Sequence, residues 1–406
     1  MIKIEKLDHL GRGIGKINNK IIFVPNSLPN ELVEIKITKE KKSFCEGIVT
    51  KYIKTSDERI KPICPYFGKC GGCDLMQMSY NNQLKYKQEK IENIMSKFDT
   101  KINNIIECDT IYNYRNKITF QVNNNLGLFT KGSNEVIKLD NCYLVNKEIN
   151  KMITSLQQLN LKNLNKIICK YTNNQMMIII DSNEELKIPD ILKRNNINIY
   201  QKTKKGYNSI QYNKPLIAIV SNKKYQISPD SFFQVNPNTT EKLYNKIKDY
   251  CINLNSKCIL DLYCGTGTIG IYVSDIADEI IGIEINKDAI EDAKNNMKLN
   301  DIKNIKFICN DVEQELKKIN TKPDTIIVDP PRSGLSKKTI KTLLNFKSTN
   351  LIYISCDPLT LKRDLELLNN YYNIIEITPF DMFPHTHHVE CVSLLCRKET
   401  SKTLEK

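Results

Sequence analysis

The second half of the chain alternates strand-like and helix-like stretches, and this alternation restricts the possible folds more than any other feature. After residue 216, short apolar runs rich in isoleucine recur at 259–262, 280–284, 305–308, 325–328 and 351–354. Amphipathic helical patterns lie between or after them, at 287–299, 336–346 and 358–369. Strands separated by helices form parallel sheets that are covered on both faces. We therefore predict a doubly wound α/β domain over residues 216–406.

The first 56 residues follow a different pattern. Ile2, Ile4 and Leu7 alternate with charged residues, and further strand-like runs cover 21–25, 32–37 and 44–53, while Gly11, Gly13 and Gly15 interrupt the first run. Four or five short strands in this length predict a small OB-like β-barrel over residues 1–56. The chain carries a net charge of +14, and many of its lysines fall in this segment. Such a surface suits the phosphate backbone of a nucleic acid, although a solvated lysine face is the plain alternative.

Residues 57–215 predict a separate central domain of α+β type. A cysteine-rich segment lies between Ile63 and Cys73, and a helix should begin near Ser79, a suitable N-cap. From about residue 105, strand-like runs alternate with polar turns rich in asparagine.

Bulk composition predicts a cytoplasmic protein. The sequence has no apolar run long enough to span a membrane, and its first residues lack the apolar stretch of a signal peptide. Its 14 cysteines are then expected to be thiols, metal ligands or nucleophiles rather than disulfides. We expect a monomer with no membrane partner.

A glycine-rich loop after the first strand of the α/β domain predicts a nucleoside cofactor. Gly265, Gly267 and Gly270 satisfy G-x-G-x-x-G, and Glu284 follows about 20 residues after the loop begins. This pattern fits either NAD or S-adenosylmethionine. Asp261 ahead of the glycines, and the Asp329-Pro330-Pro331 turn after the fourth strand, favour S-adenosylmethionine. An NAD-dependent oxidoreductase is the alternative.

Cys356 and Glu390 predict covalent catalysis on a pyrimidine ring. Carbon 5 of uracil is a poor nucleophile until a thiolate adds to carbon 6, and a base must later remove the proton from carbon 5. Cys356 precedes a helix expected from Pro358, whose N-terminal amides could depress its pKa. Amino-group methyltransferases use a similar acid-Pro-Pro turn but need no cysteine. His385, His387 and His388 are too closely spaced for a zinc site with Cys391, and we interpret them as loop residues.

Over essentially its whole length the sequence resembles the bacterial RNA uracil-C5 methyltransferases, in particular the 23S rRNA (uracil-5-)-methyltransferase type. The resemblance implies that the N-terminal barrel is a TRAM RNA-binding domain. It implies a 4Fe-4S cluster on four thiolates, for which zinc is the chemical competitor. The expected cluster ligands are Cys64, Cys70, Cys73 and Cys142, with Cys108 as a weaker candidate for the fourth. It also implies contacts to S-adenosylmethionine from Gln234, Tyr263, Thr268, Glu284, Asp311 and Asp329.

By the same resemblance Cys356 is the nucleophile and Glu390 the base. The implied function is methylation of uridine at carbon 5 in structured RNA, most of all 23S ribosomal RNA, because the transfer-RNA relatives usually lack both the barrel and the cysteine signature. Two alternatives stay open: the same chemistry on a transfer-RNA uridine of the position-54 type, and a non-catalytic iron–sulfur protein that binds RNA.

Overall fold

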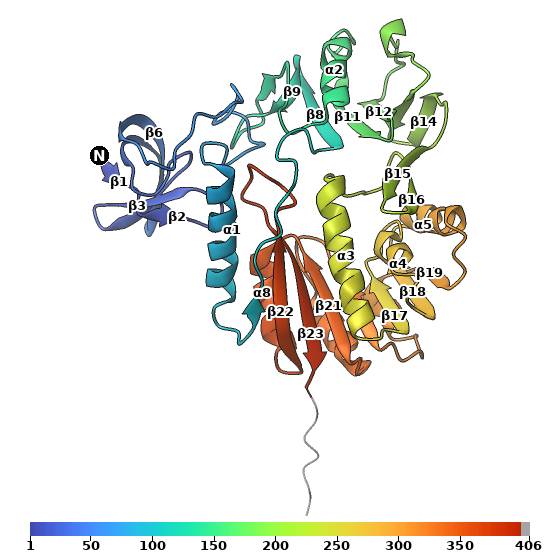
Figure 1. Ribbon diagram of the computed structural model, residues 1–406. Coiled ribbons are helices and arrows are strands. Elements are labelled where there is room, and N and C mark those ends of the chain that lie inside the picture. The colour runs from blue at the N-terminus through green and yellow to red at the C-terminus, as the bar shows by residue number, and fades with distance from the viewer. Residues whose placement is uncertain (399–406) are drawn as a thin grey trace, which may run out of the picture. The chain divides into compact units, whose positions relative to one another are not determined.

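The computed structural model describes residues 1–398, which form two compact units (Figure 1). The first unit contains Met1–Lys90, Asp109–Lys214 and Phe383–His388. The second contains Ile91–Cys108, Pro215–Met382 and the chain from Val389. The chain therefore passes between the units several times. Within this described part, no helix combines the length and the apolar character needed to cross a bilayer.

The N-terminal part of the first unit is an all-β domain, as predicted. Its sheet has the order β1-β5-β6-β4-β3-β2. The strands are β1 (Ile2–Lys3), β2 (Lys6–Leu7), β3 (Gly13–Ile17), β4 (Lys20–Val24), β5 (Leu32–Glu40) and β6 (Phe44–Lys54). Alternate side chains point inward, and Ile22, Val24, Val33 and Cys45 form the core.

The glycines near the N-terminus do not all interrupt a strand, contrary to expectation. Gly13 begins β3 and Gly15 lies within it. A Cβ atom on Gly13 would lie 2.0 Å from Ser27 Oγ, and one on Gly15 would lie 2.8 Å from the carbonyl oxygen of Lys3. Close approach of neighbouring chain segments therefore requires glycine at both positions.

The rest of the first unit contains a helix and a second sheet. The helix α1 (Tyr80–Met95) starts in this unit at the predicted place, and its last turn belongs to the second unit. The sheet has the order β10-β9-β8-β11-β12-β13-β14. Its strands are β8 (Lys117–Asn123), β9 (Asn125–Phe129), β10 (Val136–Lys138), β11 (Leu164–Thr172), β12 (Gln175–Ser182), β13 (Ile197–Thr203) and β14 (Gly206–Gln211), with a short helix η1 (Asp190–Leu192) between β12 and β13.

Helix α2 (Lys147–Leu156) contributes to the core of this second sheet. Asn146 caps it by accepting a hydrogen bond from the Glu148 amide at 2.9 Å. Ile149, Met152, Ile153 and Leu156 recur at helical spacing and pack in one buried cluster with side chains of β8, β11 and β12.

The second unit is built on a mixed sheet of the predicted doubly wound type. The strand order is β19-β18-β17-β20-β21-β23-β22-β7. Five neighbouring strands are parallel: β17 (Cys258–Leu262), β18 (Glu279–Glu284), β19 (Ile305–Cys309), β20 (Thr325–Val328) and β21 (Asn350–Ser355). Next come β23 (Glu390–Arg397), antiparallel to both its neighbours, then β22 (Tyr372–Phe380) and the short β7 (Lys101–Ile102).

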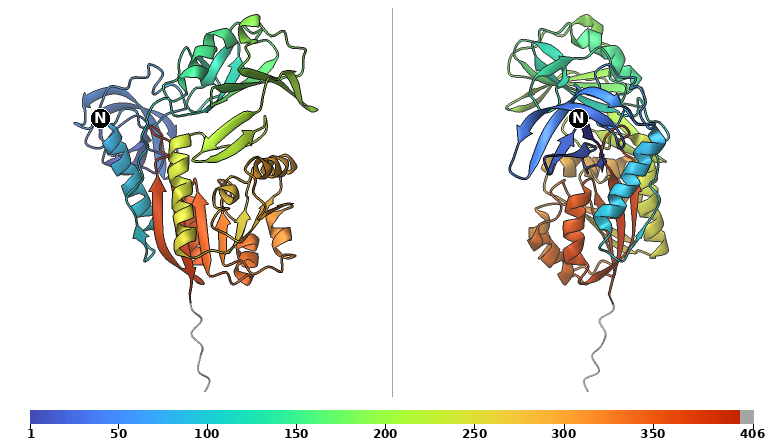
Figure 2. Two further views of the ribbon diagram at one scale, coloured as in Figure 1. Left: turned by 45° about the vertical axis from the view of Figure 1, so that its right-hand side comes forward. Right: turned by 90° about the vertical axis from the view of Figure 1, so that its left-hand side faces the viewer.

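Helices lie on both faces of this sheet, with α3 (yellow) on one side and orange helices on the other (Figure 2). They are α3 (Pro237–Asn253), α4 (Thr268–Tyr272), α5 (Lys287–Leu299), α6 (Val312–Leu316), α7 (Lys337–Asn345) and α8 (Pro358–Leu368). A hairpin of β15 (Leu216–Val220) and β16 (Lys223–Ile227) precedes them. Helices α5, α7 and α8 agree with the predicted ranges to within one residue at each end.

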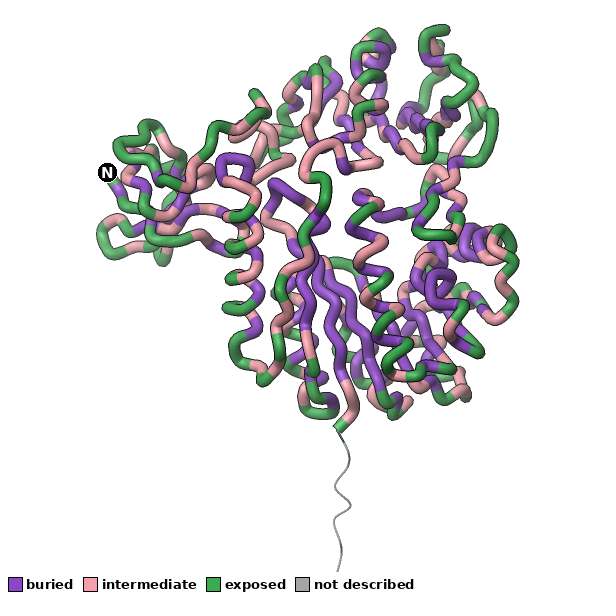
Figure 3. Tube along the Cα trace, viewed as in Figure 1, coloured by how far each residue is buried: buried purple, intermediate pink, exposed green. Residues whose placement is uncertain are grey.

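The central strands of the second unit are buried on both faces. Every residue of β20 and β21 is buried. Strand β21, labelled in Figure 1, lies in a purple part of the tube in Figure 3. Strands covered on both faces read as continuous apolar runs, which explains why the sequence identified them. The parallel strands end at one common edge, where polar residues replace the apolar ones.

Candidate active site

Three of the predicted site residues gather at the carboxyl edge of the second unit's sheet. Asp329 directly follows β20, Cys356 directly follows β21, and Glu390 begins β23. Because β23 runs antiparallel to β21 with Ser355 opposite Cys391, the next position along each strand brings Cys356 beside Glu390. The carboxyl edge of an open α/β sheet is where ligands bind.

The thiol of Cys356 does not have the depressed pKa expected from its place before a helix. Burial, together with the charges of Glu390 and Asp329, raises its pKa to about 11, although Arg332 opposes this. The helix amides are already engaged, since Asp357 Oδ1 accepts hydrogen bonds from the amides of Leu359 at 2.9 Å and Thr360 at 3.1 Å. In the absence of ligand, Cys356 is therefore a protonated thiol at neutral pH.

Glu390 is a buried carboxyl group with a strongly shifted pKa. Only 5% of the residue is exposed. Burial raises its pKa to about 8, and the nearby charge of Asp329 acts in the same direction, while Arg332 partly opposes both. A carboxyl with a pKa near neutrality can take up and release a proton during a reaction cycle.

Asp261, the fourth residue of β17, adds a third acid to this edge. Its Oδ2 accepts a hydrogen bond from the Gly270 amide at 3.0 Å, whereas Oδ1 is buried and accepts none within the described residues. Burial raises its pKa to about 7, and Asp329 and Glu284 add to the shift. Asp329 itself has a pKa raised to about 7 by burial.

This group of acids discriminates between the two cofactors that the glycines allow. A buried carboxylate oxygen with no hydrogen-bond donor requires one from a ligand, and a cationic donor would offset the repulsion among neighbouring acids. S-adenosylmethionine carries a sulfonium and an ammonium group, whereas NAD would bring a negatively charged pyrophosphate. The residues present therefore fit S-adenosylmethionine.

The loop between β17 and α4 is shaped for close approach. Gly267 has φ +76°, and a Cβ atom there would lie 2.6 Å from the ring of Phe307. Tyr263 adopts φ +61°, which is uncommon for a bulky residue and is typical of functional sites. The Gly265 amide donates to Glu284 Oε2 at 3.2 Å, so the acid at the end of β18 also holds the loop.

The remaining predicted cofactor contacts lie in the same unit but differ in their hydrogen bonds and burial. Tyr244 on α3 donates its hydroxyl hydrogen bond to Thr268 Oγ1 at 2.9 Å. Asp311 caps α6 through the Gln314 amide at 3.0 Å. Gln234 is buried, two residues ahead of the α3 N-cap Asn236. Tyr244, Arg332 and Asp261 were not among the predicted site residues. Arg332 and Asp261 lie in motifs that the sequence marked, whereas no sequence signal marked Tyr244.

The four predicted cluster cysteines come together in the first unit. Cys64, Cys73 and Cys142 pack against Met76, Tyr114 and Leu144. Burial raises the pKa of Cys73 well above its usual range, and the nearby thiols of Cys142, Cys70 and Cys64 raise it further. Across residues 1–398, no three His, Cys, Asp or Glu side chains stand close enough to hold a single metal ion. Cys108 belongs to the second unit and accepts a hydrogen bond from Asn236 Nδ2 at 3.2 Å.

The sheet order, the glycine loop and the acids at its edge define the class: an enzyme with the fold of the S-adenosylmethionine-dependent methyltransferases. Residues 79–398 match the model of the tRNA (uracil-5-)-methyltransferase family, and residues 1–50 match the TRAM domain. The chain therefore belongs to the tRNA (uracil-5-)-methyltransferase family and is an RNA (uracil-5-)-methyltransferase with an N-terminal TRAM domain.

Relatives support this membership along the whole chain. An uncharacterized RNA methyltransferase of Staphylococcus epidermidis is 33% identical, with 98% of this chain and 97% of the relative covered. One from Staphylococcus aureus is 35% identical, with 96% of each chain covered. Among solved structures, the tRNA (uracil-54, C5)-methyltransferase of Pyrococcus abyssi in complex with S-adenosyl-L-homocysteine is similar, with a TM-score of 0.79, 27% identity, and coverage of 97% of this chain and 100% of that one.

The raised pKa of Glu390 predicts a pH-dependent stability of the second unit. Since the folded pKa of about 8 lies above the ordinary value of 4.5, the unfolded chain loses this proton first. The contribution to the free energy of unfolding is therefore complete below pH 4.5 and is lost as the pH rises to 8, by on the order of 1 kcal/mol per pH unit. Urea unfolding followed by circular dichroism should show a smaller loss of the free energy of unfolding across this pH window for Glu390→Gln than for the parent.

The matched control is Glu279→Gln, which changes an exposed acid at the start of β18. Equal pH slopes for Glu390→Gln and the parent would contradict the assignment.

Proposed function

We propose that this enzyme methylates carbon 5 of a uridine in structured RNA through a covalent adduct with Cys356, and that Glu390 removes the carbon-5 proton. The observation that carries the proposal is the strand pairing of β21 with β23, which sets the thiol beside the buried carboxyl at the ligand-binding edge. Family membership and the buried acids that suit S-adenosylmethionine support it.

In this proposal Cys356 and Glu390 carry out different steps of the reaction. The Cys356 thiolate adds to carbon 6 of the ring, which makes carbon 5 electron-rich. S-adenosylmethionine held at this edge would supply the methyl group to carbon 5, with S-adenosylhomocysteine as the leaving group. Glu390 takes the proton from carbon 5, the electron pair restores the double bond between carbons 5 and 6, and the Cys356 thiolate departs. We assign Gln234, Tyr263, Thr268, Glu284, Asp311 and Asp329 to the cofactor, with Asp261 added.

The shifted pKa values make the reaction dependent on a cationic ligand. Without ligand, burial and neighbouring acids keep Cys356 as a thiol and Glu390 mostly protonated near neutral pH. A positive charge at the unpartnered oxygen of Asp261 would lower the pKa of nearby acids and of the thiol. Cys356 would then become a nucleophile only when the methyl donor is bound, which protects it from wasteful reactions.

The base must reach a uridine that is out of its stack, so the substrate is a loop or a flipped nucleotide. We propose 23S ribosomal RNA, because the chain combines a TRAM domain with four gathered cysteines. Transfer RNA is the second candidate, since the similar Pyrococcus abyssi enzyme is a tRNA (uracil-54, C5)-methyltransferase. We also propose that the enzyme is a monomer and acts in the cytoplasm, where both RNAs are made and modified in bacteria.

Covalent trapping tests the chemistry. RNA that contains 5-fluorouridine should form an adduct that survives a denaturing gel, because fluorine cannot leave as a cation, and Cys356→Ala should abolish this adduct. With ordinary uridine RNA, Glu390→Gln should accumulate an adduct that the parent releases, because the proton on carbon 5 has no base to accept it.

The control is Cys396→Ala, which changes a partly exposed thiol further along β23 and should behave as the parent. An adduct in Cys356→Ala, or rapid turnover in Glu390→Gln, would refute the assigned roles; absence of any adduct in the parent would favour a non-catalytic RNA-binding protein.

Mass mapping of methylated uridines tests the substrate. Ribosomal and transfer RNA from a deletion strain should be compared with RNA from the parent and from a strain that regains the gene. We expect one or two 5-methyluridines to disappear from 23S ribosomal RNA while those of transfer RNA persist. Loss only from transfer RNA would establish the second candidate instead.

We also propose that Cys64, Cys70, Cys73 and Cys142 hold a 4Fe-4S cluster with a structural role. Burial raises the pKa values of Cys70, Cys73 and Cys142, and neighbouring thiols raise them further, so a bound cation would relieve that repulsion. A four-iron cluster takes one thiolate on each iron, so its ligands stand farther apart than those of one zinc ion. Methyl transfer needs no electron transfer, so no step of the reaction depends on the cluster.

Metal analysis separates iron from zinc at this site. Protein purified without oxygen should contain about four irons per chain and show broad visible absorption of the sulfide-to-iron type. Cys70→Ser should lose most of the iron, whereas Cys309→Ser, which replaces an exposed thiol in the second unit, should retain it. One zinc per chain and no iron would contradict the proposal.

A further inference from the structure

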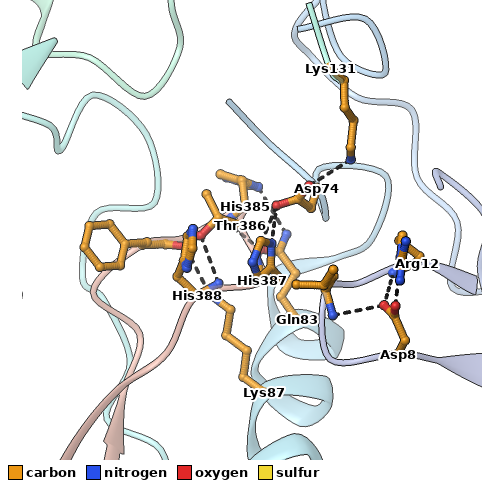
Figure 4. A network of polar contacts seen from close by, with 12 residues as sticks. Asp8, Arg12, Asp74, Gln83, Lys87, Lys131, His385, Thr386, His387 and His388 are labelled. Carbon is orange, nitrogen blue, oxygen red and sulfur yellow. Dashed lines mark hydrogen bonds and ion pairs between the residues drawn. The ribbon is translucent and has the colours of Figure 1, made fainter. Parts of the chain in front are cut away.

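Polar side chains hold one irregular segment within each unit. The first unit holds its residues 383–388, where Gln83 Oε1 accepts a hydrogen bond from the His385 amide at 2.8 Å (Figure 4). The second unit holds residues 331–335, between β20 and α7, by contacts with α8. We name residues 331–335 the arginine turn. It carries Arg332, whose charge acts on the proposed nucleophile, so the support of this turn bears on the chemistry.

The backbone of the arginine turn depends on Gly334. The Gly334 amide donates a hydrogen bond to the Pro331 carbonyl at 2.8 Å, which closes a tight turn. Gly334 has φ +71°, and a Cβ atom there would lie 2.4 Å from Asp364 Oδ2 and 2.6 Å from Arg363 Nη2. Glycine therefore allows the turn to approach α8 this closely.

Two residues of α8 bind the carbonyl oxygens of the arginine turn. Arg363 Nη2 donates to the Ser333 carbonyl at 2.8 Å and to the Leu335 carbonyl at 3.2 Å. Thr360 Oγ1 donates to the Arg332 carbonyl at 3.2 Å. Thr360 and Arg363 stand three residues apart, which places them on the same face of the helix. Helix α8 thus holds the turn at three of its carbonyl groups.

Asp364 connects the arginine turn to the strand that leads to the nucleophile. Its carboxylate is fully buried. Oδ1 accepts a hydrogen bond from Arg363 Nε at 2.8 Å, and Oδ2 accepts from the Leu335 amide and from the Tyr353 hydroxyl, each at 2.7 Å. Tyr353 lies in β21, three residues before Cys356. One buried carboxylate therefore fixes the turn, the arginine that holds it and the strand that precedes the thiol.

The place of Arg332 matters because charged groups act on the Cys356 thiol. Burial raises the pKa of the thiol to about 11. Glu390, which begins β23, and Asp329, which follows β20, raise it further, whereas Arg332 lowers it. A cation stabilises a nearby thiolate, so displacement of the guanidinium would leave a smaller fraction of thiolate at any pH below the pKa.

We propose that Arg363 and Asp364 are positioning residues that hold the arginine turn and thereby keep the Arg332 guanidinium beside the Cys356 thiol. All four residues belong to the second unit. The inference rests on the proposed function for the step that it serves, because the thiolate is the group that adds to carbon 6 of the ring. The side chain of Arg363 is half-exposed, so its replacement leaves the apolar core intact.

Alkylation of Cys356 by iodoacetamide tests this positioning in the full chain without RNA. The rate is followed by mass spectrometry of the peptide that contains Cys356, at a series of pH values below the thiol pKa. For Arg363→Met we expect alkylation to be slower by about threefold to tenfold at each pH, because less thiolate is present. Thr360→Val loses one hydrogen bond to the turn and should slow alkylation to a smaller extent, which decides the question if Arg363→Met folds poorly.

A double variant separates positioning from general damage. Arg332→Gln removes the cation itself and should slow alkylation by at least the factor found for Arg363→Met. If Arg363 acts through Arg332, the variant that carries both substitutions is no slower than Arg332→Gln alone. The matched control is Asp324→Asn, because Asp324 also accepts backbone amides, from Lys257 at 2.8 Å and Cys258 at 3.0 Å, but at the opposite edge of the sheet, where β17 begins. This control should be alkylated at the parent rate.

Parent-like alkylation in folded Arg363→Met would overturn the inference. A double variant slowed by the product of the two single effects would also overturn it, because the defect would then be independent of Arg332. The proposed function fails separately: if Arg363→Met slows alkylation as expected but the parent forms no adduct with RNA that contains 5-fluorouridine, the positioning stands and the assigned reaction does not.

Discussion

The antiparallel pairing of β23 with β21 is the constraint on which the site depends. It alone brings Glu390 to Cys356, because the two residues come from separate strands and no local turn links them. Successive side chains of a strand point to opposite faces, so a slip of one residue would turn Glu390 away from the site. The register is fixed from both sides, since β22 pairs with the other edge of β23 and buried apolar residues line all three strands.

The electrostatics of the edge follow from this placement. Asp261, Asp329 and Glu390 are acids brought to one buried region, and each has a raised pKa, to about 7, 7 and 8. Their mutual repulsion opposes folding, and the large apolar core beneath them offsets it. Burial, together with the charges of Glu390 and Asp329, also raises the pKa of Cys356.

The two units differ in their chemical features. The second supplies a rigid sheet edge with shifted pKa values. The first supplies a small β-domain of the TRAM type, with exposed lysines along its strands, and a group of thiols under an aromatic and aliphatic cover. Contacts to phosphates give affinity without choosing a base, so under the proposed function the choice of uridine would come from RNA shape and from the site that receives the ring.

The sequence by itself determined the strands and helices of the α/β domain and indicated the residues that we propose to react. Strands such as β20 and β21 are buried on both faces and so appear as unbroken apolar runs, while the helices between them end at clear caps such as Asn286 and Asp357. Cys356, Glu390 and the glycine loop were recognisable because their chemistry requires those residue types in short motifs. Gly13 shows the limit of local reasoning, since its role in β3 depends on Ser27 across the sheet.

Only the tertiary structure determined the pKa values and the hydrogen bonds of those residues. The pKa of Cys356 was predicted in the wrong direction, because a helix terminus is visible in the sequence whereas the burial of the thiol and the approach of Glu390 and Asp329 are not. The unsatisfied oxygen of Asp261, the bond from Tyr244 to Thr268 and the grip of Gln83 on His385 join segments far apart in the chain. Burial and electrostatic coupling depend on distances in three dimensions, and a linear pattern records only the residue types that are brought together.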